Sequence, residues 1–236
     1  MYIIVFAIAI LAGAVQTITG FGAAVVLMLV LPRFFDMVTA PAVSSAIAMG
    51  ISISLVWKLR KHIKLQICLL PTAVYLLCSV LGILIAKRVH LEYLSVAFGV
   101  FLIALSVYFF VFSEKIKIQA SWKMAVVCAM ISGFTAGLFG IGGPLMAAYY
   151  ISAIDDKKTY IASLQFMFAF TNVTNLFVRI FNGIFTANLL PVVLLGMLGV
   201  TIGKTGGLRI LDKVHPGKIK KLVYAFVGVS GLLSLL

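Results

Sequence analysis

The chain has 236 residues, of which 63% are hydrophobic and 11% are charged, and its formal net charge is +13 at pH 7. This composition excludes an ordinary soluble domain and is typical of a multi-pass protein embedded in the lipid bilayer. Lys and Arg gather in the cytoplasmic loops of such proteins, so the positive charge gives no reason to expect a nucleic-acid partner.

Eight apolar segments, joined by short polar links, follow one another along the chain. Most are close to the ~20 residues with which a helix spans a bilayer. They cover residues 3–31, 37–57, 67–86, 91–112, 124–154, 159–178, 187–205 and 218–236. The pattern predicts an all-α polytopic membrane protein with about six to eight membrane segments. The first residues, MYIIVFAIAI, lack a basic leading region, so no cleavable signal peptide is expected.

Two of these segments contain clusters of glycine, GAVQTITGFGAA at 13–24 and GFTAGLFGIGGP at 133–144. Interior Gly weakens a helix and Pro removes a backbone donor, so neither stretch suits a plain spanning helix. Unwound backbone at membrane depth is tolerated only where it is buried in protein or lines a cavity. We therefore expect both segments to be broken helices.

In the fifth segment we expect a helix to about Leu138, a glycine turn, and a short helix from about Pro144 to Ile154. The N-terminus of this second helix would present free N–H groups and a positive dipole end inside the membrane. Such an end suits a bound anion.

The two clusters coincide when the chain is shifted by 120 residues. The aligned pairs are Gly13 and Gly133, Gly20 and Gly140, Gly22 and Gly142, Asp36 and Asp156, Thr39 and Thr159, and Ala42 and Ala162. A constant offset over such a length indicates duplication. We expect a first repeat at 1–118 and a second at 119–236, which together form one transmembrane domain.

The loop charges predict how the repeats lie. If all eight segments cross, Lys and Arg divide 11 to 8 between the two sides, but if 124–154 returns to its side of entry they divide 15 to 4. The positive-inside rule favours the second arrangement. By the duplication, 3–31 should also be re-entrant, although a crossing 3–31 gives the same division. Each repeat then has one re-entrant segment and three crossing helices, so the repeats are inverted.

The glycine motifs, GFGAA followed by LP within 20–32 and GLFGIGGP at 137–144, resemble the sulfite exporter TauE/SafE family, also called the four-toluene sulfonate uptake permease family. The resemblance covers essentially the whole chain. It implies an inner-membrane carrier that moves sulfite, organosulfonates or related anions, often outward. The first motif has Ala23 and Ala24 where the family commonly continues with Gly, so close approach to a ligand is better supported at Gly142 and Gly143.

The glycine breaks supply the first candidate substrate-binding residues. These are Gly140, Gly142, Gly143 and Pro144 in the second break, and Gly20 and Gly22 in the first. The alternative is that these small residues only allow close packing of helices.

The sixth segment supplies the remaining candidates. Gln165, Asn172 and Asn175 share one face of a helix, where amide groups could donate to an oxyanion. Ser45 and Ser52 occupy the positions equivalent to Gln165 and Asn172 in the first repeat. The alternative is ordinary hydrogen bonding between helices. Weaker candidates, namely Gln16, Thr17 and Thr19, lie beside the first break.

Charged residues offer little further chemistry. Asp36 and Asp156 are expected to cap helices, and Lys204 either extends to the interface or contacts an anion from the cytoplasmic side. All six acidic residues lie at or near loops, so no buried carboxylate is available to carry a proton. Scattered Cys and loop His residues predict no catalytic residue, metal site or cofactor.

The sequence therefore predicts a membrane transporter and not an enzyme, and the resemblance implies the cell inner membrane. The resemblance implies an exporter of sulfite or organosulfonates, and the expected partners are this small anion and the bilayer. An uptake permease for a sulfur compound such as thiosulfate and a non-transporting membrane assembly subunit stay as alternatives. A homo-oligomer is left open.

Overall fold

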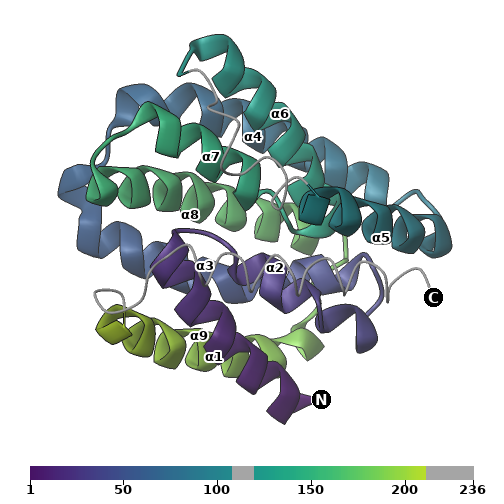
Figure 1. Cartoon of the computed structure of the whole chain (residues 1–236). Coiled ribbons are helices and arrows are strands. Elements are labelled where there is room, and N and C mark those ends of the chain that lie inside the picture. The colour runs from purple at the N-terminus through teal and green to yellow at the C-terminus, as the bar shows by residue number, and fades with distance from the viewer. Residues whose placement is uncertain (108–119, 211–236) are drawn as a thin grey trace.

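The computed structural model describes residues 1–107 and 120–210, and the regular structure of that part is helical throughout (Figure 1). The long helices are α1 (Tyr2–Thr19), α3 (Thr39–Leu59), α4 (Leu65–Ala86), α6 (Trp122–Phe139), α8 (Lys157–Phe181) and α9 (Leu190–Ile210). The shorter helices are α2 (Ala23–Met28), α5 (Leu91–Val107) and α7 (Gly143–Ala153), and 3-10 turns lie at Leu31–Arg33, Arg60–His62 and Ala187–Leu189. Within the described ranges, six helices are long and apolar enough to cross a membrane. The predicted all-α multi-pass fold is confirmed, while segment 218–236 lies outside the described residues.

Both glycine clusters break their helices at equivalent positions. Gly20 ends α1 with φ 83° and Gly140 ends α6 with φ 72°, a left-handed conformation that Gly adopts without steric cost. Each donates its N–H to the carbonyl four residues earlier, that of Gln16 or Ala136. The second break falls within one residue of its predicted position, because its conformation is encoded locally.

Other glycines of the clusters serve helix packing. A Cβ on Gly13 of α1 would collide with the backbone of Val200 in α9, and a Cβ on Gly133 of α6 would collide with that of Tyr75 in α4. The shift of 120 residues that aligns α1 with α6 also aligns α9 with α4. Each broken segment thus packs against a crossing helix of the other half of the chain, as small residues allow in membranes. Gly13 and Gly133 are therefore packing residues.

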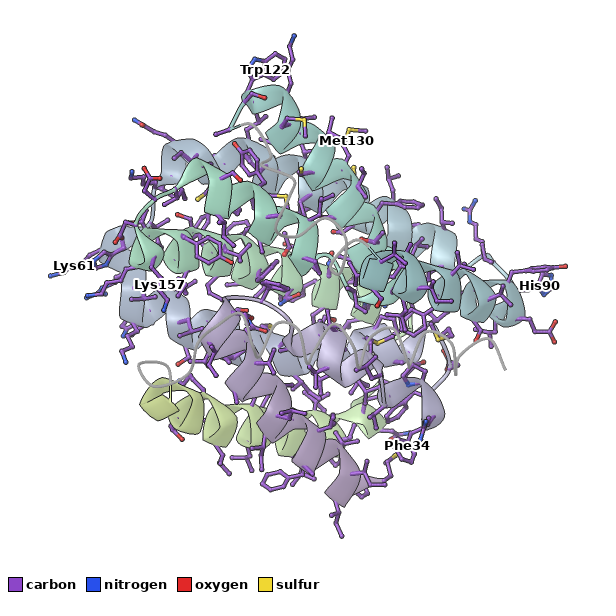
Figure 2. All side chains as sticks on the ribbon, in the orientation of Figure 1. Phe34, Lys61, His90, Trp122, Met130 and Lys157 are labelled. Carbon is purple, nitrogen blue, oxygen red and sulfur yellow. The ribbon has the colours of Figure 1, made fainter. Side chains whose placement is uncertain are left out.

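The links between helices gather at two ends of the bundle. Figure 2 shows Lys61 and Lys157 at one end and Phe34 and His90 at the other. We call the first the lysine-rich end, made of residues 58–64 and 155–158. The opposite end is made of residues 29–38, 87–90 and 182–189.

Hydrogen bonds support this grouping. Lys87 Nζ donates to the carbonyl of Asn182 at 2.9 Å, at the opposite end. At the lysine-rich end, the N–H of Lys64 donates to Ser163 Oγ at 3.4 Å. The described links are thus grouped as the loop charges predict, whereas which end faces the cytoplasm stays a prediction.

The two broken segments enter the bundle from different ends. α1 runs parallel to α9 away from the opposite end, and after the break α2 leads back to residues 29–38 (Figure 1). α6 runs parallel to α4 away from the lysine-rich end, and α7 leads back to residues 155–158. Both are therefore re-entrant hairpins, as an inverted repeat requires. The expected boundary at residues 118 and 119 lies at the edge of the range that the structure leaves undescribed, so the division into repeats stays a prediction.

One loop assignment is wrong. We expected Arg179 in a link at 179–186, but α8 continues to Phe181 and Arg179 is only 1% exposed. A strongly polar residue near the end of an apolar segment is difficult to distinguish by composition from the start of a loop.

The aligned acidic residues cap helices, as predicted. Asp36 accepts hydrogen bonds from the N–H groups of Val38 and Thr39 at 2.9 and 2.8 Å before α3. Asp156 accepts from the N–H and the hydroxyl of Thr159 at the start of α8. Partial burial opposes ionisation of Asp36, but these hydrogen bonds outweigh it and hold the pKa of the carboxyl below its ordinary value. The pKa of Asp156 is lowered chiefly by its hydrogen bonds with Thr159.

The Asp36 cap gives a stability prediction. Asp36→Ala should lower the free energy of unfolding by about 1 kcal/mol, whereas Asp36→Asn should have little effect. Because the folded pKa is depressed, the charge contribution is complete above the unfolded pKa of about 3.9 and disappears as the pH falls through the folded pKa. Thermal unfolding in detergent at pH 7 and under acid conditions measures both effects. Equal melting temperatures for wild type and Asp36→Ala at pH 7 would contradict the capping role.

The sidedness of the two ends can be tested by labelling single cysteines on a Cys-free background. We expect residues 58–64, 113–123, 155–158 and 205–218 to face the cytoplasm, and Arg33 together with residues 87–90 and 182–186 to face outward, because Lys and Arg concentrate in the first set. Labelling of residues 58–64 and 155–158 from different sides of the membrane would contradict the fold itself.

Candidate functional site

The two helix breaks meet at one small cavity. Gly143 at the start of α7 lies against Phe21 of the first break, where an added Cβ would approach the Phe21 Cβ to 3.2 Å. The cavity has a volume of about 30 Å³ and is lined from both hairpins and from α3, α4 and α8. Its polar lining comprises Gln16, Gly22, Ser52, Tyr75, Gly140, Gly142, Gly143 and Asn172. In this conformation it has room for only about one or two water molecules.

Backbone donors line one side of this cavity. The N–H groups of Ile141, Gly142 and Gly143 donate to no acceptor in the described part of the chain, and all three residues line the cavity. The next residue, Pro144, has no N–H to compete for an acceptor. These groups stand at the positive end of α7, which has 11 residues. Together they are a run of three open donors at residues that line the cavity.

The first break contributes less to the cavity than the second. α2 has only 6 residues, so its dipole is short, and Gly20 does not line the cavity although Gly22 does. The array of donors lies mainly on the second break.

A chain of amide groups holds the first break in place. Gln165 Nε2 donates to the carbonyl of Gly20 at 2.7 Å, and Gln165 Oε1 accepts from Gln16 Nε2 at 3.1 Å. Gln16 also donates to Ser52 Oγ at 3.2 Å and lines the cavity. Gln165, a predicted ligand, therefore fixes the backbone behind the cavity, while Gln16, a weaker candidate, reaches it.

Of the other polar candidates, some reach the cavity and some do not. Asn172 lines the cavity, and its side-chain amide makes no hydrogen bond to a described residue. Asn175 lies one turn further along α8 and accepts from Ser79 Oγ at 2.8 Å. Ser45 donates to the carbonyl of Pro41 in its own helix, and Lys204 donates to Ser54 Oγ. The structure thus brings Asn172 to the cavity and leaves the other three in contacts between or within helices.

Tyr75 is a lining residue that the sequence analysis missed. It is 4% exposed, and its hydroxyl is so close to Gly142 that a Cβ there would collide with it. No hydrogen bond joins this hydroxyl to a described residue. Nothing in the sequence marks Tyr75 as a lining residue, because a Tyr within a long apolar segment such as 67–86 resembles a packing residue. Together with Asn172 it adds side-chain donors to the backbone array.

The cavity is suited to an anion by its donors alone. The lining contains no acidic side chain and no cation. N–H, amide and hydroxyl donors stabilise a negative charge without a group that titrates near neutral pH. Pro144 does not line this cavity but a second, mostly apolar hollow, so it does not contact the cavity in this conformation.

Substitutions at the second break separate binding from folding. Gly142 and Gly143 do not have positive φ, so the effect of a side chain at either position depends on the space around it. A Cβ on Gly142 would collide with the carbonyl of Ser132, whereas one on Gly143 meets only Phe21 and Phe168 at 3.2 and 3.3 Å. Gly142→Ala should therefore destabilise the protein. Gly143→Ala should fold and reduce substrate affinity at least about tenfold, because its methyl group narrows the cavity.

The matched control is Gly206→Ala, since a Cβ there has nothing within 4 Å. Melting temperature and substrate affinity, measured side by side in detergent for the three variants, check the expectation. Wild-type affinity in a well-folded Gly143→Ala protein would show that the cavity is not the binding site.

Comparison with known proteins identifies the family of this chain. The profile of the family described as "Sulfite exporter TauE/SafE" matches residues 5–234. A protein described as a probable membrane transporter, from Methanocaldococcus jannaschii, is 26% identical over 168 residues, which cover 66% of this chain and 62% of that relative. The match thus spans less than two thirds of the relative's length. No solved structure shows significant similarity. Because the family profile covers almost the whole sequence, the chain belongs to the sulfite exporter TauE/SafE family of membrane transporters.

Proposed function

We propose that this protein carries small sulfur-containing oxyanions, such as sulfite or an organosulfonate, outward across the cell inner membrane. The substrate class follows from the family description. The observation that carries the binding site is the set of unpaired donors at Ile141, Gly142, Gly143, Tyr75 and Asn172, which converge between two hairpins that enter from different ends. A packing device alone has no use for donors left without acceptors inside a membrane.

The cavity, at about 30 Å³, is too small for a sulfur oxyanion in this conformation, so transport requires movement. At the lysine-rich end, a hollow of about 250 Å³ reaches Tyr160, whose hydroxyl donates to the carbonyl of Thr19 at 3.1 Å. This contact stands between the hollow and the first break. Inverted hairpins can open the site to one end at a time by small rotations. We therefore assign the Tyr160 contact as the gate toward the lysine-rich end.

Export needs no coupling ion in this scheme. The described acidic residues, namely Asp36, Glu92, Asp155 and Asp156, are all exposed. A negative-inside potential already drives an anion out with about 2.3 kcal/mol per charge per 100 mV. The carrier therefore has only to bind, close and reopen.

Flux into proteoliposomes tests the proposal. We expect sulfite and an organosulfonate to move in the direction set by an imposed potential, faster than sulfate or chloride. Accumulation driven by a proton gradient at zero potential, and lost in Asp36→Asn or Asp156→Asn, would contradict uncoupled export. Transport of thiosulfate alone would favour an uptake permease, and no flux of any oxyanion would favour an assembly subunit.

The contribution of Asn172 gives a quantitative expectation. Asn172→Leu should weaken sulfite binding about ten- to a hundredfold, because a donor to a charged oxygen contributes about 1.5–3 kcal/mol. Asn175→Leu is the matched comparison on the same helix, since the Asn175 amide already accepts a hydrogen bond from Ser79 Oγ. It should lower stability more than affinity. Equal affinities for Asn172→Leu and wild type would remove Asn172 from the site.

A further inference from the structure

Among the described residues, one buried charge lies between the cavity and the opposite end of the bundle. Arg179, on the last turns of α8, is 1% exposed, and no acidic side chain in the described ranges pairs with it. An isolated guanidinium inside a membrane protein is costly and usually marks a functional position. The uncoupled carrier described above does not use it.

Its partners are neutral carbonyls from both halves of the chain. One terminal nitrogen donates to the carbonyl of Val38, just before α3, at 3.1 Å. The other donates to the carbonyl of Gly137, in the last turn of α6 before the break, at 2.9 Å. The buried Nε has no hydrogen-bond partner among the described residues. The guanidinium thus links the segment that follows the first hairpin, at Val38, to the second hairpin, at Gly137, and its Nε–H is still free to donate. Neutral carbonyls compensate the positive charge less well than an anion does.

A polar strip connects this charge to the cavity. Asn172, Asn175 and Arg179 follow one another at spacings of three and four residues, so they share one face of α8. Asn172 lines the cavity, and Gly137 lies one turn before Gly140, which also lines it. An anion leaving the cavity along this face would meet Arg179 next.

The strip ends in a charge in one half of the chain only. The shift of 120 residues places Ser52, Leu55 and Leu59 at the positions of Asn172, Asn175 and Arg179. α3 therefore lacks an equivalent cation of its own, and the cation beside it is Lys204 of α9, which donates to Ser54 Oγ and is only partly buried. The two ends thus differ in the cation that they offer, a fully buried guanidinium at the opposite end and a partly exposed ammonium toward the lysine-rich end.

We propose that Arg179 is a second anion-binding site, which receives the oxyanion after it leaves the cavity toward the opposite end. This inference rests on the proposed function. The planar guanidinium offers paired donors that match two oxygens of a sulfite or sulfonate group. As the anion binds, its oxygens replace the carbonyls of Val38 and Gly137 as acceptors for the guanidinium. The link that Arg179 makes between Val38 and the second hairpin is then released. The gate at this end therefore opens in response to an anion.

The competing explanation is a structural clamp, in which Arg179 only ties the two carbonyls together. A clamp needs donors but no charge, so Arg179→Gln should preserve it at least as well as Arg179→Lys. In an anion site, the positive charge contributes most to the affinity, and the paired donors of the planar guanidinium contribute less. The affinity for sulfite should then be highest in wild type, lower in Arg179→Lys and lowest in Arg179→Gln.

The test is sulfite flux in proteoliposomes of known orientation, with KM measured separately from each face. For Arg179→Gln we expect KM at the face of the opposite end to rise about ten- to a hundredfold, with a smaller rise for Arg179→Lys. KM at the lysine-rich face should stay close to wild type for both. Arg33→Gln is the matched control, because Arg33 is exposed at the same end.

Each outcome decides the question. Equal KM values for wild type and Arg179→Gln, or equal rises at both faces, would overturn the second site and leave the proposed function intact. A lowered melting temperature with unchanged KM values would show a clamp. If Arg179→Gln does not fold, Arg179→Lys carries the test, since it keeps the charge and loses the fork. Absence of sulfite flux in wild type would instead overturn the proposed function.

Discussion

Backbone groups inside a membrane must find hydrogen-bond partners within the protein, and the rest of this structure depends on how the two helix breaks meet that constraint. Around the breaks the carbonyls are occupied: that of Thr19 accepts from Tyr160, that of Gly20 from Gln165, and that of Gly137 from Arg179. The N–H groups of Ile141 to Gly143 are not occupied by any described acceptor. Satisfied acceptors beside open donors make the centre of the protein electrostatically favourable for an anion.

One helix supplies most of this support. Tyr160, Gln165 and Arg179 all project from α8, and each reaches a carbonyl at or next to a break. α8 in turn packs along α3 and α4, and its start is fixed by the Asp156 cap. A small shift of α8 would therefore act on both hairpins at once. This arrangement offers a physical route by which a bound anion at the centre, or at Arg179, could alter both ends of the bundle.

The sequence predicted the features that are encoded locally. Left-handed turns at Gly20 and Gly140 follow from glycine alone, and the caps at Asp36 and Asp156 follow from side chains a few residues from their partners. Loop charges predicted the grouping of the links. What the sequence could not show depends on partners distant along the chain: Gln165 donates to a carbonyl 145 residues away, and Arg179 is buried because the carbonyls of Val38 and Gly137 accept from it there. Tyr75 was missed for the same reason, since only the fold brings it beside Gly142.

The central claim is that backbone N–H groups at the second break bind the anion. Glycine-selective ¹⁵N labelling makes it directly measurable, because Gly142 and Gly143 report on the break while Gly50 and Gly206 lie elsewhere. Titration with sulfite should shift the amide resonances of Gly142 and Gly143 and leave those of Gly50 and Gly206 unchanged, because a hydrogen bond to an anion deshields the amide proton and nitrogen. Unmoved Gly142 and Gly143 resonances in a protein that still transports sulfite would contradict the claim.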